Sequence, residues 1–94
     1  MSEKYKSFVQ ATATEIDRIL QGFGLRGQVV GGDMMGPLCQ FNWQIGTGPE
    51  PETKRLGRIE REQVEKALID GINAQRIAYT GDGIIIVTVP YARA

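Results

Sequence analysis

The segment Leu38-Cys-Gln-Phe-Asn-Trp-Gln-Ile45 alternates between two kinds of side chain along its whole length. One set of alternate positions is apolar, namely Cys39, Phe41, Trp43 and Ile45, and the other set carries three amides. Because successive side chains of a β-strand point to opposite faces, this pattern predicts a strand that is covered on one side only. Core packing is then the favoured role for the two aromatic rings, and Cys39 is interpreted as a small buried hydrophobe.

A helix is predicted before this strand. Its apolar residues recur at steps of four and three, the spacing of one helix face, and they are Val9, Ala13, Ile16, Leu20 and Phe23. Either Ser2 or Ser7 could cap its start, and Gly22 with Gly24 is predicted to end it.

A second helix is predicted after the strand, from about Glu60 to Ile72. Its predicted buried stripe consists of Val64, Ala67, Leu68, Gly71 and Ile72.

Three further strands complete the predicted fold. A short extended run from Gly27 to Gly31 reaches a turn over residues 32–37, and residues 76–80 with 84–89 form a hairpin. The last run is apolar on both faces, which predicts a central place in the sheet. The order α-β-β-α-β-β therefore predicts an α+β, two-layer fold with a four-stranded mixed or antiparallel sheet and two helices on one face.

The 94 residues are expected to form a single domain, 1–94, with residues 1–7 as an N-terminal extension. Residues 46–55 are predicted to form an exposed loop, since the run Gly46 to Thr53 combines two Gly, two Pro and two Glu.

Composition excludes several classes of function. The chain has 11 Lys plus Arg, 11 Asp plus Glu, no His and one Cys. Zinc clusters, Cys/His pairs and Ser/His/Asp triads cannot be assembled from these residues, and balanced charge argues against a globally basic nucleic-acid binder. A lone Cys, no long apolar run and a polar N-terminus predict a cytoplasmic location without membrane contact.

The sequence contains no motif that indicates catalysis or cofactor binding. The run Gly22-Phe-Gly24-Leu-Arg-Gly27 matches G-x-G-x-x-G, but a helix enters it and a strand leaves, the reverse of a dinucleotide site. Glu50 with Glu52, and Glu60 with Glu62, are the close carboxylate pairs, and both are expected in solvent, where their pKa values have no reason to move. We therefore predict no enzyme activity for this chain alone, no cofactor and no metal.

Four cations gather where the loop meets the second helix: Lys54, Arg55, Arg58 and Arg61. Two interpretations compete. The cations form a solvated face paired with neighbouring glutamates, or they contact the phosphates of a nucleic acid or an acidic partner.

The order of short motifs resembles the small α/β domain of FtsK/SpoIIIE-type DNA translocases. The matching pieces are Phe23-Gly24 with Val29-Val30, Gly36-Pro37, Leu56 to Ile59, Ala67-Leu68, Arg76-Ile77 and Val89-Pro90. The sequence departs from the family pattern at the hairpin, where Thr80-Gly-Asp-Gly83 replaces a cation by an anion, and in the longer, more acidic loop.

The resemblance implies a non-catalytic module that precedes a RecA-like motor, supports ring formation around duplex DNA and couples the ring to DNA movement. A full-length parent would be an ATP-dependent DNA translocase, whose motor is absent after Pro90. The expected partners are a second copy or a motor domain, with duplex DNA as a further candidate, and the expected binding residues are Lys54, Arg55, Arg58, Arg61 and Arg76. The alternative is a free-standing adaptor or inhibitor, of plasmid or phage type, that binds a partner protein.

Overall fold

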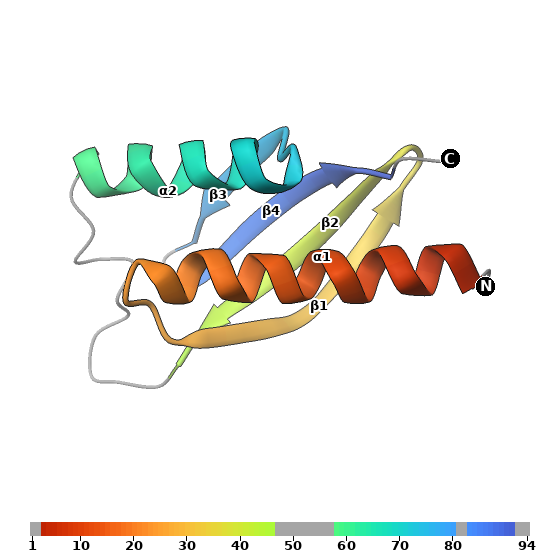
Figure 1. The fold of residues 1–94 in the computed structure, drawn as a ribbon, viewed down its shortest axis with the longest axis horizontal. Helices are drawn as coiled ribbons and strands as arrows, with labels where there is room; N and C mark the ends of the chain where they lie inside the picture. The colour runs from red at the N-terminus through yellow and green to blue at the C-terminus, as the bar shows by residue number, and fades with distance from the viewer. Residues whose placement is uncertain (1–2, 47–57, 81–82, 92–94) are drawn as a thin grey trace.

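The computed structural model describes residues 3–46, 58–80 and 83–91. Two helices and four strands follow one another as predicted (Figure 1). They are α1 (Glu3–Gly22), β1 (Gly27–Met35), β2 (Leu38–Ile45), α2 (Arg58–Ile72), β3 (Arg76–Tyr79) and β4 (Ile84–Pro90). The predicted α+β class and element order are confirmed.

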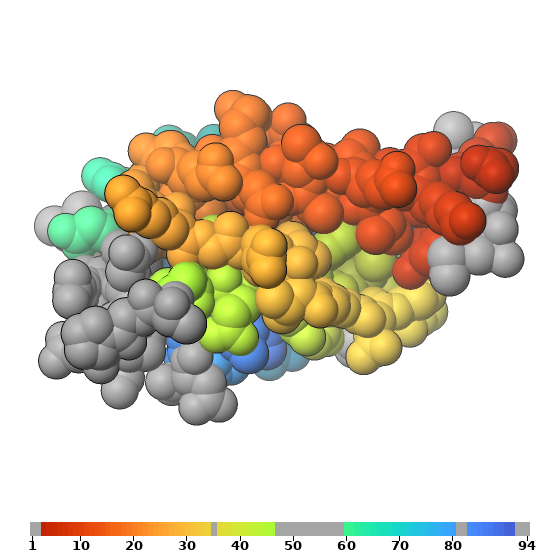
Figure 2. Space-filling model, turned by 90° about the horizontal axis from the view of Figure 1, so that it is seen from below, coloured from red at the N-terminus to blue at the C-terminus, as the bar shows by residue number. Residues whose placement is uncertain are grey.

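The four strands form one sheet in the order β1-β2-β4-β3, and every neighbouring pair is antiparallel. β4 therefore lies between β2 and β3, as its two apolar faces predict. Both helices pack on the same face of this sheet (Figure 1), and the edge strand β1 runs along the surface beside α1 (Figure 2). The result is two layers, with the core between the helices and one sheet face.

The alternation that predicts β2 is confirmed. Its four apolar positions are at most 4% exposed, and the residues between them are partly exposed. Trp43 is fully buried, and its indole N–H donates to Oδ1 of Asp17 on α1 over 2.8 Å. From the helices the core receives Ile16, Ile19, Leu20, Val64 and Leu68, and from β4 it receives Ile85, Val87 and Val89.

The first strand is longer than predicted. Pairing with β2 continues through Gly32 and Asp33 to Met35, so the predicted turn at residues 32 and 33 is wrong. The turn lies at Gly36, whose φ of 62° is in the left-handed region. Gly32 does not break the strand because its missing side chain allows close approach: a Cβ there would collide with the carbonyl oxygen of Gln40.

The end of α1 also differs from the prediction. Phe23 lies beyond the helix and is 38% exposed, so its assignment to the buried stripe is wrong. Gly24 takes φ of 81°, and the amides of Gly24 and Leu25 bond the carbonyls of Gln21 and Leu20. This left-handed helix end turns the chain so that Leu25, 4% exposed, enters the core instead.

Two helix boundaries shift. α1 begins by Glu3 and includes Ser7, which is therefore not a cap, and residues 3–7 belong to the helix. α2 begins at Arg58, and Gly71, predicted to be buried, is exposed at its other end. Neither described helix combines the length and apolarity needed to cross a bilayer.

Candidate partner-binding face

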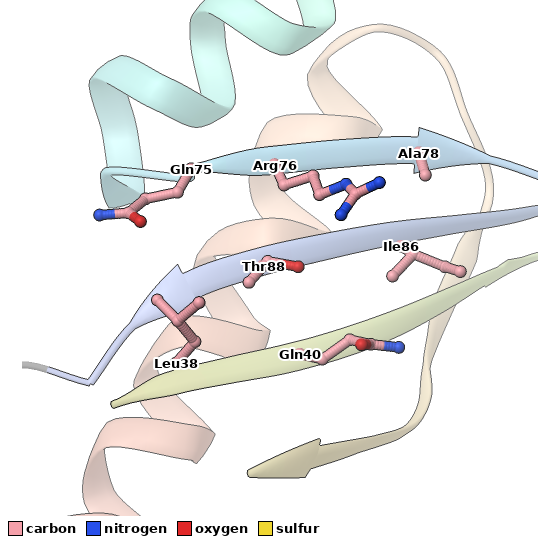
Figure 3. A pocket seen from close by; sticks show the side chains of 7 residues that line it. All are labelled: Leu38, Gln40, Gln75, Arg76, Ala78, Ile86 and Thr88. Carbon is pink, nitrogen blue, oxygen red and sulfur yellow. The ribbon is translucent and has the colours of Figure 1, made fainter. Parts of the chain in front are cut away.

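The sheet has one face that neither described helix covers, and we call it the open face (Figure 3). It consists of the strand residues that alternate with the core positions: Asp33 of β1, Leu38, Gln40, Asn42 and Gln44 of β2, Arg76 and Ala78 of β3, and Ile84, Ile86, Thr88 and Pro90 of β4. The same period of two that buries one side of β2 turns its three amides toward the other side.

A hollow of about 460 Å³ lies on the open face, over β2, β4 and β3 (Figure 3). Its lining residues are Leu38, Gln40, Gln75, Arg76, Ala78, Ile86 and Thr88. Small side chains at Ala78 and Thr88 leave this space among longer neighbours. A backbone hydrogen bond holds the strands beneath it, since the backbone N–H of Gln75 donates to the backbone carbonyl of Thr88 over 2.8 Å. The hollow thus has a fixed floor and a mixed apolar and polar rim.

One row of residues crosses all four strands of the open face. Register pairs Asp33 with Gln40, Gln40 with Thr88, and Thr88 with Arg76. Directly paired residues share a face of the sheet, so this row has an acid at the β1 edge and a cation at the β3 edge. Gln40 also donates from Nε2 to Oδ1 of Asn42 over 3.3 Å, which orients the two central amides.

Arg61, one of the predicted binding residues, lies on the opposite side of the sheet. Its guanidinium carbon is 5.0 Å from the ring centre of Tyr79, a cation–π contact that holds the half-buried α2 side chain against β3. Burial raises the pKa of Tyr79 to about 12, with the Glu65 carboxylate adding to the rise and Arg61 opposing it. Arg61 therefore has a structural contact within the chain.

The structure describes only some of the predicted binding residues. Lys54 and Arg55 lie outside the described residues, and of Arg58 only the backbone is described, in the first turn of α2. Arg61 and Arg76 lie on opposite faces of the sheet, so these two cations do not form one patch. Of the two predicted cations whose side chains the structure describes, Arg76 lines the hollow and Arg61 does not.

Sequence reasoning missed the other residues of the hollow. Gln40, Thr88 and Ala78 carry no motif, and they become neighbours because β2, β4 and β3 pair in that order. The signal that could have found them was the amide set on the polar side of β2, which we used only to predict a strand.

The described residues include one thiol and one of the two predicted carboxylate pairs. Cys39 is buried and 3.9 Å from the Tyr5 hydroxyl, and burial raises the pKa of its thiol. Glu60 and Glu62 are exposed, as predicted. Within residues 3–46, 58–80 and 83–91, no three His, Cys, Asp or Glu side chains come together as a metal site.

A second, smaller hollow of about 240 Å³ lies on the helix side, between α1 and the end of α2. Glu15 is the charged residue of its lining, and Arg18 binds this carboxylate over 2.7 Å and lowers its pKa. This hollow is therefore a mainly apolar groove, and Arg18 of the same helix neutralises the Glu15 carboxylate in its lining.

Comparison with protein-family models, with curated proteins and with solved structures found no match to the chain. The resemblance to the translocase domain therefore rests on the short motifs alone and stays a prediction.

Proposed function

We propose that this chain is a non-catalytic assembly module, resembling the domain that precedes the motor of FtsK/SpoIIIE-type DNA translocases, and that it acts through its open face. The observation that carries the proposal is a sheet face left uncovered by both helices, with a hollow beside Arg76. A hollow with a mixed apolar and polar lining can bind another molecule, which suits a module that supports ring formation and DNA movement.

The placement of the resembling motifs supports the proposal. Gly36-Pro37 forms the connection from β1 to β2, Arg76-Ile77 opens β3, and Val89-Pro90 ends β4. Ala67-Leu68 lies on α2, where Leu68 is fully buried. These four motifs lie in the elements where the proposal requires them, and Leu56 and Gly57 of a further motif lie outside the described residues.

In the proposed role, the open face lies toward duplex DNA or the neighbouring subunit. Arg76 supplies an exposed guanidinium that can bind phosphate, and amide and hydroxyl groups such as those of Gln40 and Thr88 can also contact the DNA backbone. The predicted cations Lys54, Arg55 and Arg58 would add further phosphate contacts. Each phosphate neutralised lowers the logarithm of the binding constant by about 0.9 per tenfold rise in salt.

The test is sedimentation of the purified chain with a labelled duplex at low and moderate salt. We expect a salt-sensitive complex, weakened in Arg76→Glu and in Arg55→Glu/Arg58→Glu. Lys66→Glu is the matched control, because Lys66 is an exposed cation of α2 on the helix side. No complex at low salt, or equal binding by all variants, would overturn the DNA-proximal role.

One observation favours the second candidate, an adaptor or inhibitor that binds a partner protein. The polar row of the open face has both an acid and a cation, a mixed pattern that suits oriented protein contact better than a polyanion. Under this function the chain ignores DNA at low salt, and one protein is retained by wild type but lost with Arg76→Glu. Retention that is unaffected by this substitution counts against it.

A further inference from the structure

The open face has a charge pattern that is complementary to itself. Asp33 on the β1 edge and Arg76 on the β3 edge belong to one transverse row, on either side of Gln40 and Thr88. A two-fold axis parallel to the strands, passing between β2 and β4, exchanges the two edges of the sheet when a second copy is placed face to face. Each Asp33 then lies opposite Arg76 of the other copy, and the contact occurs twice.

We propose that a second copy of this chain covers the open face, forming a two-fold, sheet-to-sheet dimer. The proposal extends the assembly role argued above by naming one contact and its partner. The dimer and DNA would compete for the open face and Arg76, so the dimer is tested in the absence of DNA. A two-fold contact closes at two copies and supplies one pairwise contact of an assembly, not a ring by itself.

The hollow fits the same arrangement. With this axis, β2 of one copy faces β4 of the other, so Leu38 and Gln40 of the second copy point toward the hollow floored by Ala78 and Thr88. The hollow has an apolar and amide lining that can take up these two side chains. Aligned packing of two twisted sheets at about 30° is a common arrangement of this kind.

The alternative axis is less favourable. A two-fold axis perpendicular to the strands would place each edge of the sheet opposite the same edge of the other copy. Arg76 of one copy would then lie near Arg76 of the other, and the two Asp33 side chains would also lie near each other. Like charges brought together in this way disfavour the contact, so the row of charges selects the axis parallel to the strands.

The size of the face predicts a weak dimer. Four strands spaced about 4.8 Å apart and about seven residues long give a flat area of roughly 400 Å² per copy. Two copies bury somewhat more than twice that, which is below the ~1,200 Å² of stable specific interfaces and in the range of weak, transient contacts. A weak dimer, with a dissociation constant in the micromolar range or above, is therefore expected.

The experiment is sedimentation equilibrium of the full chain from micromolar to millimolar concentration, without DNA. We expect a monomer–dimer equilibrium that closes at two copies. Asp33→Lys and Arg76→Glu should each weaken it by about tenfold, since each replaces two attractive rim pairs by repulsive ones. Asp70→Lys and Lys66→Glu make the same changes of charge on exposed positions of α2 and should leave it unchanged.

Mixing the two open-face variants supplies the sharper result. A mixture of Asp33→Lys with Arg76→Glu restores opposite charges at both rim positions, so a heterodimer of near wild-type strength should form. Ile86→Lys, in the middle of the open face, should abolish dimerisation while its circular dichroism spectrum shows a folded chain. If Ile86→Lys does not fold, Ala78→Gln serves as the second variant, because its longer side chain fills the hollow and should weaken the dimer.

Three results would overturn the dimer: a monomer at every concentration, growth beyond two copies, or dimerisation unaffected by all open-face changes. A monomer that still binds duplex DNA would overturn only this dimer, whereas a dimer that ignores DNA would overturn only the DNA-proximal part of the proposed function. The two failures are therefore distinguishable.

Discussion

Trp43 on β2 and Asp17 on α1 are joined by a hydrogen bond from the indole Nε1 to Oδ1 over 2.8 Å, although 26 residues separate them in sequence. The ring is fully buried, so its N–H has no access to water. This bond allows a large aromatic side chain to fill the centre of the core without an unsatisfied donor, and it ties the first helix to the central part of the sheet.

Removal of the acceptor should destabilise the fold. In Asp17→Ala the buried indole N–H loses its partner, which costs about 1–3 kcal/mol of unfolding free energy. Asp17→Asn keeps an oxygen acceptor and should lose less. Urea unfolding followed by tryptophan fluorescence measures both values, with Asp70→Ala as an exposed acidic control. Equal losses for the Ala and Asn variants would contradict the assigned bond.

Gly32 should not tolerate a side chain. A Cβ at this position collides with the backbone carbonyl oxygen of Gln40, and backbone cannot move aside as a side chain can. Gly32→Ala should therefore lower the unfolding free energy by about 1–3 kcal/mol or separate part of β1 from β2. Gly31→Ala is the matched control, because no atom lies within 4 Å of a Cβ built there. Hydrogen exchange of the β1 amides distinguishes the two variants, and similar protection in both would refute the steric argument.

Gly24 should be replaceable only at a cost. Its φ of 81° lies where residues with a Cβ are strained, so Gly24→Ala should destabilise the chain by about 1 kcal/mol. Gly22→Ala, two residues earlier and within α1, meets no atom within 4 Å and should be neutral or slightly stabilising. Thermal unfolding of the two variants provides the comparison. A stabilised Gly24→Ala would show that the helix end adopts another conformation.

Tyr79 should make stability fall at high pH. The pKa of an exposed tyrosine is ordinarily 10.0, and burial raises the pKa of Tyr79 to about 12 in the folded chain. A raised folded-state pKa means that the folded chain binds the proton more tightly, so the stabilisation is complete below pH 10 and is lost as pH rises toward 12. The difference between unfolding free energies of wild type and Tyr79→Phe, measured from neutral to alkaline pH, isolates this residue. A constant difference across that range would exclude the assigned shift.

Cys39 should react slowly in the folded chain. The thiol is 3% exposed, and burial raises its pKa, which lowers the fraction of reactive thiolate. Labelling by an aromatic disulfide reagent should be limited by opening of the structure and become fast in urea. Tyr5→Phe removes the hydroxyl 3.9 Å from the sulfur, which is a weak contact, and should change the rate little. Fast labelling of the native chain would place the thiol at the surface.

Local patterning predicted the order of elements. The strict alternation of Leu38 to Ile45 and the helical spacing of Ile16 and Leu20 both encode which side faces the core, because burial follows the period of the element. The central place of β4 followed from its apolar character on both faces in the same way.

Local patterning predicted the wrong element boundaries near two glycines whose roles depend on tertiary contacts or on an unusual backbone conformation. Gly32 looked like a turn residue, yet it extends β1 because only a residue without Cβ fits against the carbonyl of Gln40. Phe23 fitted the helical spacing, yet the left-handed turn at Gly24 ends the stripe and places Leu25 in the core.

The sequence by itself determined the element types, their order and the buried side of β2, since these depend on spacing between neighbours along the chain. Only the tertiary structure decided which side chains meet on the open face and that Arg61 and Arg76 are on opposite sides of the sheet. Strand order and register bring together Gln40, Thr88 and Arg76 from three separate segments, and no local pattern encodes that pairing.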